Sequence, residues 1–285
     1  MRYEAVSSVD EAVSLLAEAG DGGRVLAGGT DLLVQLRAGI RTPDVMVDVK
    51  NIPQLKEITV SDDGIRIGAA VAGAELSEHD VVPNVWPGVV EAVDLIGSTQ
   101  IQGRASAGGN LCNASPAADS VPAMIAAGAV CTVAGPNGTR EVAVEDIPTG
   151  PGQTSLGDGE FVVDFFLPAQ PAGTGDAYLR MIPRTEMDIA IAGAGVCMTV
   201  DGDGTITSAR VSLGAVAPTA LLVQDCADAI IGSKLDDDAM AKLDAAAQAA
   251  CNPIDDKRGT IAYRKKVAGV LARRAAAIAY ERAQA

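Results

Sequence analysis

Two glycine pairs with polar neighbours are the residues of this sequence best suited to hold a ligand. The first pair is Gly28-Gly29, which follows the apolar run 25–27 and precedes Thr30. Paired glycines let an anion approach the main chain closely and let successive backbone N–H groups turn toward one point. A helix predicted to begin near Thr30 would add the positive end of its dipole. The loop is therefore a candidate phosphate site. It lacks the GxGxxG spacing of a dinucleotide fold and the lysine of a P-loop, and a plain tight turn is the alternative.

The second pair, Gly108-Gly109, lies in a segment rich in short polar side chains. These side chains belong to Ser106, Asn110, Asn113, Ser115 and Asp119. Hydroxyl, amide and carboxylate groups can hydrogen-bond the hydroxyls of a sugar and the oxygens of a phosphate. Two such loops in one domain could hold the two halves of a dinucleotide, so cofactor binding stands beside plain tight turns as an equal alternative.

The remaining residues with redox or metal chemistry form no recognisable site. No CxxC pair occurs among the five cysteines, which are Cys112, Cys131, Cys197, Cys226 and Cys251. This dispersed set argues against an iron–sulfur cluster or a zinc site held by this chain. The single histidine, His79, has no motif around it that would support a metal site or a catalytic triad. If the chain takes part in redox chemistry, the redox group must be an organic cofactor.

Composition narrows the class of protein further. A chain of 285 residues is long enough for two modest domains. The formal charge of −15 argues against nucleic acid as a partner, because binding to phosphates needs a cationic surface. No apolar run approaches the ~18 residues of a membrane span. Residues 1–10 lack the basic-then-apolar order of a signal peptide. We therefore expect a soluble chain located in the cytoplasm.

Local patterns predict a small α/β unit at the N-terminus and a mixed segment after it. Ser8 and Glu11 form a capping box for a helix that ends at Gly20, and Thr30 is the predicted N-cap of a second helix. The expected helices are 8–20, 31–38, 75–80, 85–95 and 120–127, and the expected strands are 24–27, 45–49, 58–60, 65–67, 130–133, 140–144 and 161–167. Residues 97–116 show little periodicity and are predicted to be an ordered, functional loop.

A second domain is predicted after residues 168–175, where proline, alanine and glycine dominate as in a linker. Three strand-like runs follow at 177–182, 189–200 and 206–213, and then helices at 237–250 and 263–282. The expected division is 1–170, with subdomains of about 1–55 and 56–170, and 177–285.

With these motifs in place, the sequence resembles a known family. Residues 27–32 and 106–110 closely resemble the two FAD pyrophosphate loops of the molybdenum hydroxylase flavoproteins. That family includes the medium subunit of carbon monoxide dehydrogenase and the FAD domain of xanthine dehydrogenase. The likeness continues through residues 113–119, 149–154, 188–190 and 212–219. The resemblance implies an α+β fold, with a two-lobed FAD-binding domain of the PCMH/VAO-like kind. A smaller C-terminal α+β domain with a three-stranded antiparallel sheet would follow it.

The resemblance also implies which residues contact FAD. Matching by position gives Ala27, Gly28, Gly29, Thr30, Asp31, Leu32, Ile96, Ser106, Ala107, Gly108, Gly109, Asn110, Asn113, Asp119, Val162, Arg180 and Ile189. The two glycine loops would bind the pyrophosphate, and Asp119 the ribityl or ribose hydroxyls. Val162 would pack near the adenine end, Arg180 would lie near the flavin, and Ile189 beside the isoalloxazine.

Two positions depart from the family pattern. Ser106-Ala107 replaces the commoner Thr-Ile, a change that keeps the hydroxyl. Ile96 replaces an aromatic residue of some relatives, so stacking is not implied at that position.

One FAD and no metal are expected in this chain. Valine at Gly28 or Gly109 is expected to abolish FAD binding and to leave most of the fold intact. Asn110→Ala and Asp119→Ala are each expected to weaken FAD binding by about 1–3 kcal/mol.

The implied function is electron transfer within a larger enzyme, without a catalytic residue in this chain. In the family, a large molybdopterin-binding subunit hydroxylates the substrate and a small 2Fe-2S subunit relays electrons to FAD. The FAD then reduces NAD⁺, a quinone or oxygen. We expect the same partners here, in a dimer of heterotrimers. Two alternatives stay open: a free-standing FAD oxidase or reductase, and an assembly subunit without flavin.

Overall fold

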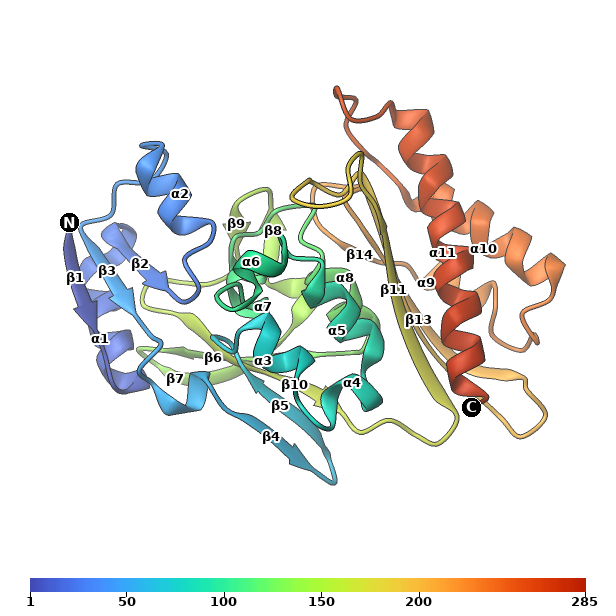
Figure 1. Ribbon diagram of the computed structural model, residues 1–285, viewed down its shortest axis with the longest axis horizontal. Coiled ribbons are helices and arrows are strands. Elements are labelled where there is room, and N and C mark those ends of the chain that lie inside the picture. Colours follow the sequence, from blue (N-terminus) through green and yellow to red (C-terminus); the bar gives the residue numbers. More distant parts are fainter.

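The computed structural model describes residues 1–285 (Figure 1). At the N-terminus a parallel sheet with the order β1-β3-β2 consists of β1 (Arg2–Ala5), β2 (Gly23–Leu26) and β3 (Val45–Asp48). Helix α1 (Val9–Ala19) connects the first two strands, and the backbone N–H of Glu11 donates to its N-cap, Ser8, as the sequence predicts. Strand β1 was not predicted, because its residues are mostly polar and exposed. Helix α2 (Leu32–Arg37) and the 3-10 turns η1 (Gly20–Gly22) and η2 (Pro53–Leu55) complete this unit.

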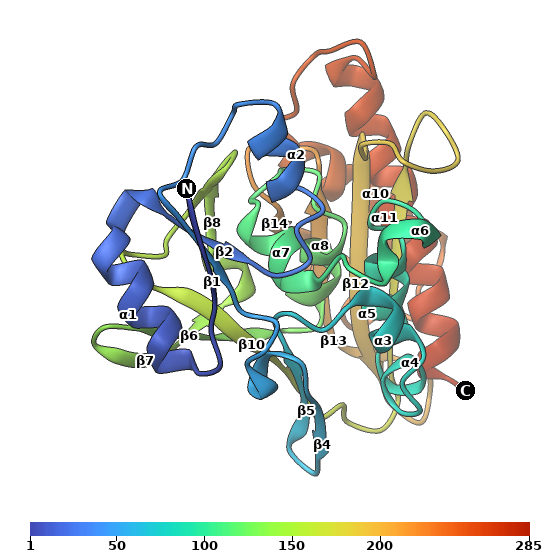
Figure 2. The same ribbon diagram turned by 60° about the vertical axis from the view of Figure 1, so that its left-hand side comes forward.

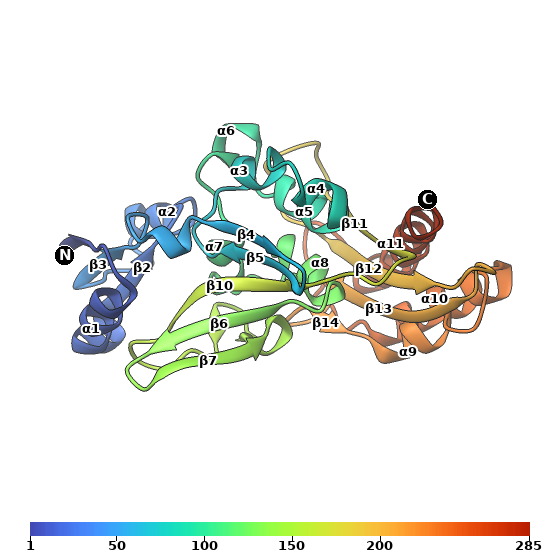
Figure 3. The same ribbon diagram turned by 90° about the horizontal axis from the view of Figure 1, so that it is seen from below.

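The middle of the chain forms a five-stranded antiparallel sheet with the order β4-β5-β10-β6-β7. Its strands are β4 (Ile58–Ser61), β5 (Gly64–Gly68), β6 (Val130–Gly135), β7 (Gly138–Ala143) and β10 (Phe161–Pro168). Figure 3 shows helices α3 (Gly73–Ser77), α4 (Val82–Val85), α5 (Pro87–Asp94) and α6 (Thr99–Gln102) on one side of it. Helices α7 (Ala107–Cys112) and α8 (Ser120–Ala126), the turn η3 (Val144–Asp146) and the hairpin β8 (Pro148–Gly150) and β9 (Gln153–Thr154) complete this part.

The prediction that residues 97–116 form a loop without regular structure was wrong, because α6 and α7 both lie within this segment. Short helices rich in glycine and polar residues carry no hydrophobic period, so sequence patterns do not reveal them. Helix α7 is instead defined by its cap: the Oγ of Ser106 accepts a hydrogen bond of 3.1 Å from the N–H of Gly109.

The C-terminal part is an antiparallel sheet covered by helices. Its strands are β11 (Thr174–Met181), β12 (Ala192–Val200), β13 (Ile206–Gly214) and β14 (Leu221–Leu222). The sheet therefore has four strands rather than the predicted three, since a two-residue strand leaves no readable alternation. The strand predicted from residue 189 begins only at Ala192. Helices α9 (Gln224–Asp228), α10 (Asp237–Ala250) and α11 (Ile261–Ala283) follow, and α11 runs along β11 (Figure 1).

No helix combines the length and the apolar composition that crossing a membrane would require.

Strand β10 ends at Pro168 in the middle sheet, and β11 begins at Thr174 in the C-terminal sheet. The predicted division of the chain at this connection stays a prediction.

Buried charge joins the two halves of the molecule. Asp176 on β11 is 3% exposed, and its Oδ2 accepts a hydrogen bond of 3.2 Å from the N–H of Val89 on α5. The other carboxylate oxygen, Oδ1, is buried without a hydrogen-bond partner. Close by, Glu91 of α5 forms an ion pair with Arg282 of α11. Burial raises the pKa of Asp176 to about 7, because the charged form loses its hydration.

We expect Asp176→Asn to stabilise the protein at neutral and alkaline pH. The folded-state pKa of Asp176 lies above the unfolded value, so folding favours the protonated form. The stability of the natural chain should therefore fall as pH rises from about 4 to about 7, by roughly 2–4 kcal/mol from this group. Urea unfolding of both proteins across this range measures the effect. Parallel pH profiles for the two proteins would contradict it.

Candidate functional site

A cleft of about 400 Å³ lies where the N-terminal unit meets the middle of the chain, a usual size for a cofactor site. Both glycine loops line it. Of the positions predicted to contact FAD, the lining includes Ala27, Gly28, Gly29, Thr30, Asp31, Leu32, Ile96, Ser106, Gly108, Gly109, Asn110, Asn113 and Val162. Figure 2 shows α2, which follows the first glycine pair, above α7, which contains the second.

Two of the glycines allow backbones to approach closely. A Cβ atom on Gly28 would lie 1.9 Å from the carbonyl oxygen of Arg104, so Gly28 contacts the main chain just before Ser106. A Cβ atom on Gly108 would lie 2.3 Å from the carbonyl oxygen of Ala69. Any side chain at these two positions would push backbone segments apart. Gly28 therefore brings the two glycine loops together, and Gly108 fixes α7 against the turn after β5.

The other two glycines contribute differently. Gly29 has a φ of +79°, the left-handed region that favours glycine. Gly109 is exposed and lines the cleft, and the single atom near a Cβ built there is the Oγ of Ser106, at 3.3 Å. The space in front of Gly109 is thus open to a ligand. This open cradle fits a phosphate group held by main-chain atoms.

Helix α2 starts later than the sequence suggested. It begins at Leu32, and Asp31 rather than Thr30 occupies the N-cap position, without a side-chain capping bond. The prediction of Thr30 as N-cap was wrong, because the chain is still turning at Gly29-Thr30. Asp31 keeps an exposed surface, and its partial desolvation at the cleft raises its pKa.

Two asparagines of the second loop connect the walls of the cleft. The Oδ1 of Asn110 accepts hydrogen bonds from the N–H and the Oγ of Ser120, at 3.2 and 2.8 Å. The amide nitrogen of Asn110 is thereby left for a ligand. The Oδ1 of Asn113 accepts a hydrogen bond of 2.9 Å from Nε2 of Gln35 on α2. Asn113 therefore ties one lobe to the other.

Four of the predicted contact residues lie outside the cleft lining: Ala107, Asp119, Arg180 and Ile189. Asp119 is buried beside the C-terminal sheet, where its Oδ2 lies 2.5 Å from Nη1 of Arg180. Its Oδ1 accepts a hydrogen bond of 3.0 Å from the hydroxyl of Tyr178. Ile189 lies on the loop between β11 and β12 and is 50% exposed. The roles of these four toward FAD stay predictions.

Sequence reasoning missed one wall of the cleft. Residues 157–160, which precede β10, line it together with Thr154 and Leu156, and Arg24 and Arg41 lie on the N-terminal side. The Gly-Asp-Gly turn at 157–159 was the available signal. His79 does not line the cleft. Its Nδ1 accepts hydrogen bonds from the N–H groups of Val81 and Val82 and so caps a turn.

Comparison with known proteins identifies the family of the chain. Residues 1–170 match the family described as the FAD binding domain in molybdopterin dehydrogenase. The chain belongs to this family. The remainder agrees, since residues 177–279 match the C-terminal domain of the CO dehydrogenase flavoprotein.

Relatives of this FAD-binding family resemble the chain along most of its length. The carbon monoxide dehydrogenase medium chain of Hydrogenophaga pseudoflava is 33% identical over 280 residues, which cover 98% of this chain and 97% of the relative. The xanthine dehydrogenase FAD-binding subunit of Escherichia coli O157:H7 is 33% identical over 224 residues, 78% of this chain and 76% of the relative. In the crystal structure of a Cu,Mo-CO dehydrogenase, one chain superposes with a TM-score of 0.95 at 34% identity, over 99% of this chain and 98% of that one.

The predicted family, α+β fold, oxidoreductase class and FAD cofactor are thereby confirmed. The cleft is compatible with a bound cofactor, because the space in front of Gly109 is open and the amide nitrogen of Asn110 forms no hydrogen bond within the chain. The chain is an FAD-binding subunit of the molybdenum hydroxylase type.

Proposed function

We propose that this chain is the electron-transfer subunit of a cytoplasmic molybdenum-containing hydroxylase or dehydrogenase. It would receive electrons from a small 2Fe-2S subunit and deliver them to NAD⁺, a quinone or oxygen. The observation that carries the proposal is the meeting of two glycine loops, distant in sequence, at one cleft in a chain of this family. FAD, when bound, supplies the ability to exchange electrons singly or in pairs.

The chain's own residues would bind and orient the cofactor. Gly29-Thr30 and Gly109-Asn110 would hold the pyrophosphate from two sides, and Asn113 with Gln35 would keep the two lobes at the right separation. Val162 would pack against one end of the cofactor. The single histidine is engaged in a turn, so the cleft has no imidazole for acid–base catalysis on a substrate of its own.

The proposed partners are a large molybdopterin-binding subunit and the small 2Fe-2S subunit, in a dimer of heterotrimers. The names "medium chain" and "FAD-binding subunit" of the relatives support an assembly. Beside the cleft, Leu33 and Val34 of α2 and the nearby Ile40 are 48%, 65% and 70% exposed. Exposed apolar groups next to a redox site are suited to a protein contact. We place the 2Fe-2S subunit there.

Purification from the native source tests this function. A tagged chain should bring down two further chains, and acid treatment should release FAD in a 1:1 ratio to this subunit. A chain that purifies only as a monomer or homodimer would contradict the assembly. Release of FMN would contradict the use of two phosphate loops.

A further inference from the structure

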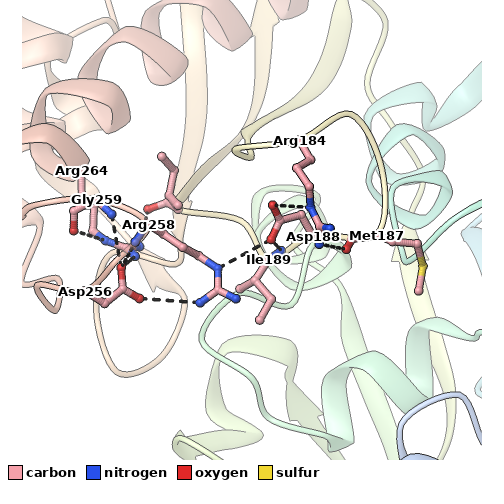
Figure 4. Close-up of polar contacts among 9 residues, drawn as sticks. Arg184, Met187, Asp188, Ile189, Asp256, Arg258, Gly259 and Arg264 are labelled. Carbon is pink, nitrogen blue, oxygen red and sulfur yellow. Dashed lines mark hydrogen bonds and ion pairs between the residues drawn. The ribbon is translucent and has the colours of Figure 1, made fainter.

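The loop between β11 and β12, residues 182–191, is held by a cluster of charged side chains (Figure 4). Asp188 is at its centre: Oδ1 accepts from the N–H of Ile189 at 2.8 Å, and Oδ2 accepts from Nε of Arg184 at 3.2 Å. Arg184 also donates to the carbonyl oxygen of Met187, at 2.9 Å. These bonds close the loop on itself.

A relay of ion pairs connects this loop to α11. Nε of Arg258 lies 3.6 Å from Oδ1 of Asp188, and its Nη1 lies 3.8 Å from Oδ2 of Asp256. Asp256 in turn accepts a hydrogen bond of 2.8 Å from Nη2 of Arg264, which is 3% exposed. Arg264 also donates from Nη1 to the carbonyl oxygen of Ile191, at 2.9 Å. The buried guanidinium of Arg264 thus binds the end of the loop directly, at Ile191. It is also connected to Asp188 through Asp256 and Arg258 (Figure 4).

The free side of the loop reaches the edge of the cleft. The N–H of Met187 donates to the carbonyl oxygen of Gly97 at 3.3 Å, and the neighbouring Ile96 lines the cleft. Met187 has a φ of +50°, which is strained for a residue with a side chain. Met187 and Ile189 are 56% and 50% exposed, so burial contributes little to holding them. The polar contacts therefore hold this exposed part of the loop, whereas Ala190 and Ile191 at its end are buried.

We propose that Arg258 is a positioning residue for the flavin. By pairing with Asp188 it fixes the loop that carries Met187 and Ile189 at the Ile96 end of the cleft, and so sets the surroundings of the isoalloxazine. The assignment rests on the proposed function, because it requires the flavin ring at that end. Arg258 is the link that ties Asp188 to another part of the chain, because Arg184, the other ion-pair partner of Asp188, belongs to the loop itself.

The test uses the assembled, FAD-loaded complex. In Arg258→Ala we expect FAD to dissociate roughly fivefold faster and the shape of the flavin absorption band and the flavin midpoint potential to change. Arg258→Lys should restore these properties in part, because it keeps the charge. Lys257→Ala is the matched control: Lys257 is adjacent and exposed, and it forms no ion pair. Asp188→Asn keeps the shape of the side chain and should reproduce the changes even if Arg258→Ala lowers stability.

Coupling between the two residues distinguishes positioning from general destabilisation. The double variant of Arg258→Ala and Asp188→Asn should change the flavin no more than either single variant. If Arg258→Ala and Asp188→Asn both match the Lys257→Ala control in absorption band, potential and FAD release, the positioning role is wrong. That result leaves the proposed function standing as long as Gly109→Val still removes FAD. Full FAD occupancy in Gly109→Val would overturn both proposals.

Discussion

Gly109→Val should remove FAD from the protein while the FAD-free chain remains folded. The first residues of α7 carry Gly109 at the exposed side of the cleft, where a new side chain occupies the open space rather than the core. We expect FAD affinity to fall on the order of 100-fold or more, equivalent to roughly 3 kcal/mol. The apo melting temperature should change little, because residues with side chains are better helix formers than glycine.

Gly28→Val is the informative comparison. It should also lose FAD, but through damage to the fold, because the Cβ atom would lie 1.9 Å from the carbonyl oxygen of Arg104. The sequence alone led to the same expectation for both glycines, and the structure separates them. Titration with FAD and thermal unfolding of both apo variants give the two readouts. An equal loss of melting temperature in Gly109→Val and Gly28→Val would refute this distinction.

In the assembled enzyme, Gly109→Val should separate the oxidation of the substrate from the reduction of the acceptor. Under the proposed function, the substrate should still reduce the iron–sulfur clusters, while transfer to the natural acceptor stops. Gly109→Ala should lose less FAD and less electron transfer to the acceptor than Gly109→Val, since a methyl group fills less of the cleft. Unchanged turnover with the natural acceptor would argue against electron flow through this site.

Asp119→Ala should destabilise the protein by about 3–5 kcal/mol, because it leaves a charge buried without its partner. Arg180 and Asp119 have side chains that are 6% and 10% exposed, and Tyr178 donates its hydroxyl to the same carboxylate. The sequence-based expectation was a loss of FAD affinity instead. The pair joins the start of α8 to β11, so the damage should appear in folding first.

A double variant measures this effect most directly. Asp119→Ala combined with Arg180→Met removes both charges, and it should recover much of the stability that the single change loses. Asp119→Asn should be intermediate, because an amide oxygen can still accept the hydrogen bond of Tyr178. Urea unfolding of the FAD-free chain gives the free energies. A double variant less stable than Asp119→Ala alone would show that the unpaired charge is not the cause.

The sequence by itself determined the features that depend on a few neighbouring residues. Helix α1 follows from its apolar period and its Ser8 cap, the hairpin of β4 and β5 from its Asp-Asp-Gly turn, and the FAD loops from their glycine pairs. Such signals are local, because capping, turn geometry and side-chain alternation act over a few positions. Where the local signal is weak, as in α6, α7 and β14, the sequence failed to show the element.

The tertiary structure alone decided what individual residues in those loops do. Gly28 and Gly109 look alike in sequence, yet one contacts the backbone of Arg104 and the other faces the cleft. Asp119 belongs to the same polar segment of the sequence as Asn110 but pairs with Arg180, which lies in the other half of the molecule. These differences arise from contacts between segments far apart in the chain. Packing of the sheets and helices sets such contacts, and no local pattern encodes them.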